Sequence, residues 1–231
     1  MPGRLLSLLV ERPRLIVSLP ENSPALARAA AEGGADALKV HLHITHQASG
    51  TRFGSLAEER ANLAEILSLR LPTGVVPGAG DCLTTYEELC ELARMGMDFF
   101  DLFLRDMPAW MLTFSGMTRA AAVDQSTDLD SLREWEAVGI EMIEAAIVPR
   151  EGYGKALRVS DVVAYRRIRR ATKLPIIVPT ERAIAPEDVP LLVQQAGVNA
   201  IMIGAVVTGR EPETLGAAAQ RFARALAGAR G

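Results

Sequence analysis

Three side chains capable of chemistry stand at alternating positions of one short segment: Lys39, His41 and His43. The positions between them, from Leu38 to Ile44, are all apolar. A period of two residues is typical of a β-strand whose two faces differ. If the apolar face packs against helices, the three polar side chains point into the interior of a closed sheet.

Lys39 is one of only three lysines in a chain with 25 basic residues. Burial disfavours the charged form of an amine and lowers its pKa, which would make Lys39 a general base or an imine-forming nucleophile. Glu144 lies in another apolar segment between small residues, and a Lys39–Glu144 pair could divide acid and base work. The alternative is a structural ion pair of Lys39 with Asp101, Asp124 or Glu144.

The histidines allow two interpretations. His41 and His43 form an H-x-H pair, which can ligate a metal on one face of a strand. A stable site needs further ligands from other strands, and the remaining histidine, His46, lies close by in the same segment. We therefore predict no metal and no cofactor, and we expect His41 or His43 to serve in acid–base or hydrogen-bonding work.

Several carboxylates follow predicted strands. Glu21, Asp81, Asp124 and Glu181 each come shortly after such a strand. Barrel enzymes place their reactive groups at the ends of strands, although some of these side chains will only cap helices. Of the four, Glu181 joins Lys39, His41 and Glu144 as a predicted catalytic residue.

Eight apolar strand patterns alternate with helical patterns along the chain. We predict the strands at residues 14–19, 36–44, 73–78, 97–104, 119–124, 140–148, 174–178 and 199–204. Such a pattern predicts a (β/α)8 TIM barrel, with an open doubly wound sheet as the rival fold. Helix starts are predicted at Ser23-Pro24 and at two capping boxes, Ser55 to Glu58 and Thr84 to Glu87. The helix expected near 107–114 has the weakest pattern.

Composition narrows the class of protein. A chain of 231 residues with 49% hydrophobic content suits one domain over residues 1–231. With a net charge of −3 and no basic patch, we predict no nucleic-acid partner. No apolar run approaches a membrane span, so we expect a cytoplasmic protein without a membrane partner. Cys82 and Cys90 are expected to be free thiols, and a homodimer would be in keeping with a barrel of this size.

The last two predicted strands lead into loops that suit an anion. In eightfold barrels the loops after these strands often hold a phosphate. The predicted phosphate-binding residues are Thr180, Arg182, Gly204, Ala205, Thr208 and Gly209. Two further loops, at 45–54 and 150–155, are candidate lids. Ordinary turn chemistry is the alternative for all of these loops.

Three segments resemble one known superfamily. P-I-I-V-P-T-E-R-A-I-A-P-E-D-V and N-A-I-M-I-G-A-V-V-T-G resemble the ribulose-phosphate-binding barrels, and most of all the N-acylglucosamine-6-phosphate 2-epimerases. G-G-A-D-A-L-K-V-H-L-H is similar to the second strand of the ribulose-phosphate 3-epimerases. The resemblance implies a (β/α)8 barrel, a phosphorylated small-molecule ligand, and a phosphate site at Gly204 and the loop after it.

The catalytic residues of those families are not retained. The 2-epimerases have a catalytic lysine after the third strand, where this chain has Val75 to Ala79. The 3-epimerases have metal ligands in the second strand, where this chain has Lys39 and His41. We therefore predict an isomerase, an epimerase or a carbon–carbon lyase acting on a phosphosugar-like metabolite, with Lys39 as its base or imine-forming amine. The alternative is a non-catalytic phosphometabolite-binding or regulatory barrel.

Overall fold

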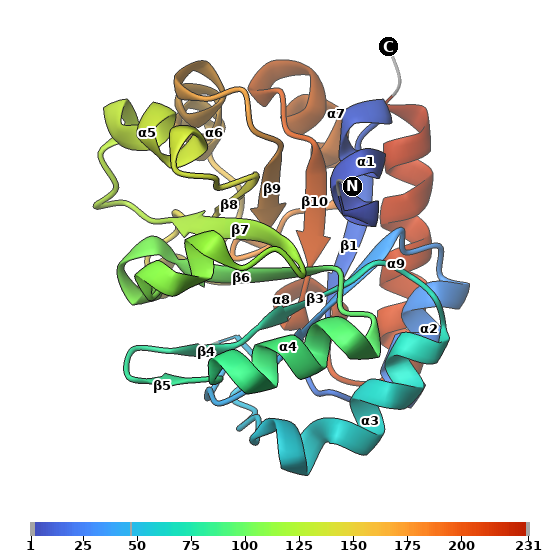
Figure 1. Cartoon of the computed structure of the whole chain (residues 1–231). Helices are drawn as coiled ribbons and strands as arrows, with labels where there is room; N and C mark the ends of the chain where they lie inside the picture. The colour runs from blue at the N-terminus through green and yellow to red at the C-terminus, as the bar shows by residue number, and fades with distance from the viewer. Residues whose placement is uncertain (1–2, 47, 230–231) are drawn as a thin grey trace.

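The chain folds into a closed barrel of eight parallel strands (Figure 1). The computed structural model describes residues 3–46 and 48–229. The barrel strands are β1 (Arg14–Ser18), β2 (Ala37–His41), β3 (Thr73–Val76), β6 (Phe99–Phe103), β7 (Thr118–Val123), β8 (Met142–Ala145), β9 (Ile176–Pro179) and β10 (Ala200–Ile203). The predicted (β/α)8 barrel is confirmed, because β1 pairs with β10 and closes a sheet that would otherwise be open.

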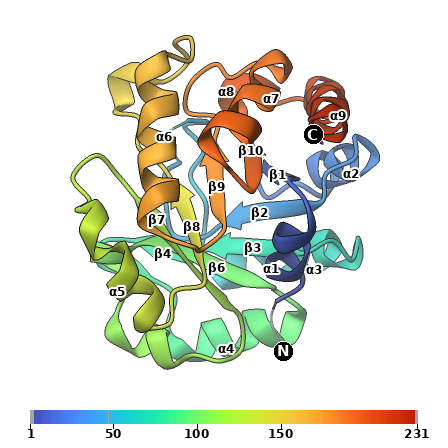
Figure 2. The same cartoon turned by 90° about the horizontal axis from the view of Figure 1, so that it is seen from above.

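Helices surround the barrel (Figure 2). They are α1 (Arg4–Glu11), α2 (Pro24–Glu32), α3 (Leu56–Ser68), α4 (Tyr86–Met95), α5 (Leu132–Ala137), α6 (Val159–Ala171), α7 (Val189–Leu191), α8 (Ala205–Thr208) and α9 (Pro212–Gly228). In the described part of the chain, no helix has both the length and the apolar character needed to cross a membrane.

Side-chain caps explain where several helices begin. The Ser23 side chain accepts a hydrogen bond from the Leu26 N–H, and Ser55 and Glu58 form the predicted capping box of α3. The second box is made by Thr85 and Glu88, one residue later than predicted. Thr84 does not serve as the cap because its side chain is buried and its N–H donates to the carbonyl of Pro77.

The connection between β6 and β7 differs from the other units. In place of the predicted helix near 107–114, two short 3-10 segments occupy Leu104–Asp106 and Ala109–Thr113. Pro108 stands between them with an extended backbone and cannot donate the hydrogen bond of a continuing helix. A small hairpin, β4 (Gly78–Ala79) with β5 (Cys82–Leu83), also follows β3.

Apolar side chains fill the end of the barrel where the strands begin. There α1 lies across the opening (Figure 1). Its Leu5 and Leu9 pack into the interior. They meet inward-facing residues of the strands: Ile16, Ala37, Phe99, Ala120, Met142, Ile177, Ala200 and Met202. Gly74 leaves room for the Phe99 ring, since a Cβ there would lie 2.1 Å from it. This apolar floor separates α1 from the polar layer above.

Because of this apolar floor, substitutions at two neighbouring positions of α1 should differ strongly in their effect on the free energy of unfolding. Leu9 is 1% exposed and Val10 is 73% exposed. We expect Leu9→Ala to lower the free energy of unfolding by about 2–5 kcal/mol, because it leaves a cavity beneath the barrel. Val10→Ala should change it by less than about 0.5 kcal/mol. Urea denaturation followed by circular dichroism measures both, and equal effects of the two substitutions would contradict the role given to α1.

Candidate active site

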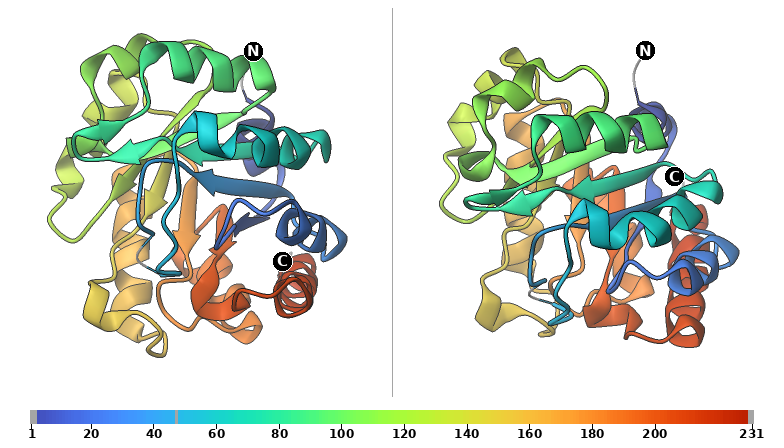
Figure 3. Two further views of the ribbon diagram at one scale, coloured as in Figure 1. Left: turned by 90° about the horizontal axis from the view of Figure 1, so that it is seen from below. Right: turned by 60° about the horizontal axis from the view of Figure 1, so that its bottom comes forward.

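A cavity of about 250 Å³ opens at the end of the barrel where the strands finish. It lies above the apolar floor because alternate residues of each strand point inward. Polar residues from five strands and the loops after them contribute to its lining: Ser18, Lys39, His41, Asp101, Glu144, Thr180 and Glu181. The segment between β2 and α3 lies across the mouth (Figure 3) and adds Thr45 and His46.

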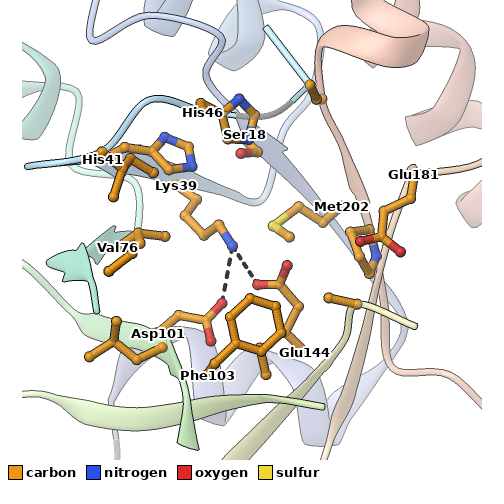
Figure 4. A pocket seen from close by; sticks show the side chains of 18 of the residues that line it. Ser18, Lys39, His41, His46, Val76, Asp101, Phe103, Glu144, Glu181 and Met202 are labelled. Carbon is orange, nitrogen blue, oxygen red and sulfur yellow. Dashed lines mark hydrogen bonds and ion pairs between the residues drawn. The ribbon is translucent and has the colours of Figure 1, made fainter. Parts of the chain in front are cut away.

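Lys39 lies between two carboxylates at the bottom of this cavity (Figure 4). Its Nζ is 3.0 Å from Oδ2 of Asp101 and also contacts Oε2 of Glu144. All three side chains are at least nine-tenths buried. Of the three acids that the sequence offered as ion-pair partners, only Asp124 lies elsewhere, paired with Arg105 at the rim.

The two carboxylates determine the charge of Lys39. Burial by itself would lower the pKa of Lys39, but the negative charges of Glu144 and Asp101 outweigh it and raise the pKa above its ordinary value. The prediction of a lowered pKa is therefore wrong, and the alternative, an ion pair of Lys39 with Asp101 and Glu144, is what the structure contains. Lys39 is therefore an ammonium group at neutral pH, and its amine is a poor base or imine-forming nucleophile in this state.

Glu144 and Asp101 titrate in opposite directions. Burial, and next the nearby charge of Asp101, raise the pKa of Glu144 well above its usual range. For Asp101, burial would raise the pKa, but the Lys39 ammonium lowers it. The cluster thus holds an ammonium between two carboxyl groups whose pKa values are shifted in opposite directions, an arrangement that can divide acid and base work.

Glu181 reaches the cavity from the loop after β9. Its carboxylate accepts hydrogen bonds of 2.8 Å from the Val148 N–H and the Tyr153 hydroxyl. Burial raises its pKa to about 7, against the lowering effect of those bonds. Glu181 is therefore close to half ionised at neutral pH, and it also attaches the segment between β8 and α6 to β9.

The candidate lid at 150–155 is held in place by several contacts. Arg182 donates to the carbonyl of Gly152 at 3.0 Å and forms a two-pronged ion pair with Asp161 in α6. The N–H of Gly154 donates to the carbonyl of Glu181. These contacts attach the segment to α6 and to the loop after β9, and its Tyr153 lines the cavity. Arg182, predicted to bind phosphate, lies outside the cavity lining because Asp161 occupies its guanidinium.

The structure places the histidines differently from the sequence prediction, which put both His41 and His43 in the barrel interior. His41 lines the cavity, whereas His43 does not. The strand ends at His41, and His43 has a left-handed backbone with φ of 55°, so the alternation stops and His46 takes the next place on the cavity. In the described residues, no group of three or more His, Cys, Asp or Glu is arranged to hold a metal ion.

His41 and His46 lie against each other as neutral imidazoles. Their ring centroids are 4.6 Å apart. Burial lowers the pKa of His41 well below its usual value, and it lowers that of His46 to about 4. Asn22 bonds both backbone groups of His41 and so fixes its position. The buried Nδ1 of His41 has no hydrogen-bond partner among the described residues.

The predicted phosphate residues fall into two sets. Thr180, Gly204 and Ala205 line the cavity, and the Gly204 N–H donates to Oγ1 of Thr180 at 3.0 Å. Thr208 and Gly209 lie outside the lining: the Thr208 side chain is buried and donates to the carbonyl of Gly209. Ala205 is the first residue of α8, where a backbone N–H has no partner within the helix.

Sequence reasoning missed some residues of the cavity. Ser18 lies beside Lys39 in the strand register and was detectable from the alternation that also turns Ile16 inward. Tyr153 and Phe103 also line the cavity. Phe103 has the parity of Asp101 in β6 and was detectable in the same way, whereas Tyr153 lies in a loop where no alternation applies.

The fold and the site together define a (β/α)8 barrel with a charged cluster at the bottom of its cavity. No family model and no curated protein matches the chain. A tryptophan synthase chain from Mycobacterium tuberculosis is similar in structure, with a TM-score of 0.77, 16% identity, and coverage of 98% of this chain and 99% of that one.

Two further solved structures are similar. KGPDC from Streptococcus mutans has a TM-score of 0.70 at 13% identity and covers 95% of this chain and 99% of its own. The tryptophan synthase A-subunit from Pyrococcus furiosus has a TM-score of 0.68 at 16% identity and covers 91% and 98%. At these identities the likeness establishes the fold.

Glu181 predicts a pH-dependent stability. Between about pH 4.5 and 7 the folded protein keeps a proton on Glu181 that the unfolded chain has lost, so its stability falls as the pH rises. Relative to Glu181→Gln, the wild type should therefore lose about 3 kcal/mol of unfolding free energy over this window. Denaturation at pH 4.5 to 8 measures the difference. Glu187→Gln, at an exposed position, is the control. The raised pKa of Glu181 would be refuted if the difference in unfolding free energy between the wild type and Glu181→Gln did not change with pH.

Proposed function

We propose that this protein is an enzyme acting on a phosphorylated, sugar-like metabolite, as an isomerase, an epimerase or a carbon–carbon lyase. The observation that carries the proposal is the cluster of Lys39, Asp101 and Glu144 at the bottom of an open cavity. Placing an ammonium and a carboxyl group of raised pKa where a small molecule can reach them is typical of active sites.

The phosphate would lie at the mouth of the cavity. Gly204 and Ala205 line it there, and the N–H groups that begin α8 suit an anion. Gly204 neighbours Ser18, which is adjacent to Lys39 in the strand register. Neighbouring strands lie about 4.8 Å apart, so roughly 10 Å separates this loop from the strand of Lys39. A chain of a few carbons joins a phosphate to a reacting carbonyl over such a span.

The charges of the cluster suggest how the groups act. The Lys39 ammonium would donate a hydrogen bond to the substrate carbonyl and stabilise the enolate that forms from it. Glu181, with a pKa of about 7, would take the proton, from carbon in an isomerisation or from a hydroxyl in a carbon–carbon cleavage. In the cleavage the electron pair of the broken bond passes to the enolate. Glu144, whose raised pKa favours its protonated form, would return a proton to carbon, and His41 would bond a substrate hydroxyl.

A non-catalytic phosphometabolite-binding or regulatory barrel is the second candidate. One observation favours it: both carboxylates next to Lys39 already satisfy its ammonium, as they would in a structural ion pair. A binding protein would take up phosphorylated ligands without changing them. An enzyme would exchange substrate protons with solvent or release a carbonyl product.

Substitution of Lys39 separates the two candidates. With a panel of sugar phosphates in D2O, proton NMR should show deuterium entering the substrate or a new carbonyl product. We expect Lys39→Met to slow this turnover by about 100- to 1,000-fold, because the stabilising charge is gone. Lys173→Met, at an exposed position, should keep full activity. Borohydride should trap no adduct, since Lys39 remains an ammonium.

The outcomes of that experiment are distinct. Full activity of Lys39→Met would overturn the assigned mechanism. Ligand binding by the wild type without turnover of any compound would support the binding barrel. Circular dichroism of Lys39→Met shows whether a loss of activity follows from unfolding.

Gly204→Ala tests the phosphate loop. A Cβ at Gly204 would lie 3.7 Å from Cβ of Ser18, an ordinary contact, so the fold should tolerate it. The added methyl group would stand in the cavity mouth, and we expect affinity for inorganic phosphate to fall about tenfold, a loss of about 1.4 kcal/mol. Gly228→Ala, which meets nothing within 4 Å, is the control. Calorimetric titration with phosphate measures the effect, and unchanged affinity would remove the phosphate from this loop.

A further inference from the structure

We propose that a hollow on the outer flank of the barrel is a second anion site, which binds an oligophosphate. The arginine hollow is lined by Leu129, Asp130, Arg133, Arg167, Arg170 and Ala171. It lies where the 3-10 turn Leu129–Ser131, which leads into α5, contacts α6, near the last turns of that helix. It shares no lining residue with the barrel cavity.

The three arginines of the hollow have no partners among the described residues. None of Arg133, Arg167 and Arg170 forms an ion pair or a side-chain hydrogen bond within that part of the chain, and all three are exposed. Two other arginines of α6 differ: Arg166 donates to the carbonyl of Gln195, and Arg169 donates to that of Thr172. The helix thus uses two arginines to attach neighbouring segments and turns two others towards the hollow.

The positive charge at the end of α6 is opposite in sign to the net charge of the whole chain. The whole chain carries a net charge of −3, yet residues 166–173 contain five basic residues and no acidic one. Like charges three and four residues apart destabilise a helix. The helix dipole favours cations in the last turn of α6, but it does not explain why Arg133 of a different helix faces the same hollow. An anion bound among the three would offset their repulsion.

The chemistry of the hollow favours a chain of phosphates. Arg167 and Arg170 are neighbours on the helix surface, with Cβ atoms about 5–6 Å apart, and Arg133 faces them from the other side. A guanidinium group forms paired hydrogen bonds with phosphate oxygens. The hollow has a volume of about 470 Å³, more than a single phosphate fills. Against the three cations stands one carboxylate, Asp130, which leaves the hollow with a net charge of about +2.

The test is calorimetric titration of the full chain at 0.15 M salt with tripolyphosphate, ATP and AMP. We expect tripolyphosphate and ATP to bind more tightly than AMP. Equal affinities for the first two would mean that the phosphate chain alone is recognised, and tighter ATP binding would mean that a nucleotide is. The affinities for tripolyphosphate and ATP should both fall by about tenfold or more in the triple variant Arg133→Gln/Arg167→Gln/Arg170→Gln. Asp130→Asn should strengthen them, because it removes the carboxylate that lines the hollow.

A matched triple variant controls for net charge. Arg94, Arg221 and Arg224 are also exposed, and they lie outside the hollow. Changing these three to Gln removes the same charge and should leave the affinity within about twofold of the wild type. The proposal is overturned if the wild type binds neither oligophosphate, if AMP binds as tightly as they do, or if both triple variants weaken equally. Loss of binding in Gly204→Ala instead would place the anion in the barrel cavity.

Discussion

The ion cluster of Lys39 with Asp101 and Glu144 is the constraint on which the rest of this site depends. Three buried ionisable groups come from three separate strands, and each would be costly alone. Together they are less costly, because the ammonium lies between two carboxyl groups. Their mutual charges outweigh burial for Lys39 and Asp101, whereas burial comes first in raising the pKa of Glu144.

The interior of the barrel is divided into two layers, and this division leaves the cluster accessible to a small molecule. Below, α1 and large apolar residues such as Phe99 and Met142 exclude water and fill the space. Above, small residues such as Ala122 and Ala146 leave a cavity beside the charged groups. Glu181 and Tyr153 fix one wall, and Arg210 bonds the carbonyl of Ser49 and so joins two loops at the mouth. The charges are buried, yet a small molecule can reach them.

Sequence patterns predicted the strands and the direction of their side chains, because these features depend on residues that are close together in the chain. The alternation around Lys39 placed its side chain and that of His41 inside, and the apolar segments located all eight strands. What sequence patterns could not decide depends on distant partners. Asp101 and Glu144, 62 and 105 positions from Lys39, were candidate ion-pair partners, but no local pattern shows that they pair with it and raise its pKa. The guanidinium of Arg182 likewise pairs with Asp161 in the preceding helix. His43 turned out of the cavity because its backbone leaves the strand, which no periodicity records.

The most direct test of this account is the charge state of Lys39. The chain has three lysines, so 13Cε- and 15Nζ-labelled lysine gives three signals, and Lys39→Met identifies one of them. Free lysine side chains titrate near pH 10.4. The account predicts that the Lys39 signal keeps its ammonium position through this range for as long as the protein stays folded. A Lys39 titration below the ordinary lysine value would contradict it and return Lys39 to the role of base or imine-forming amine.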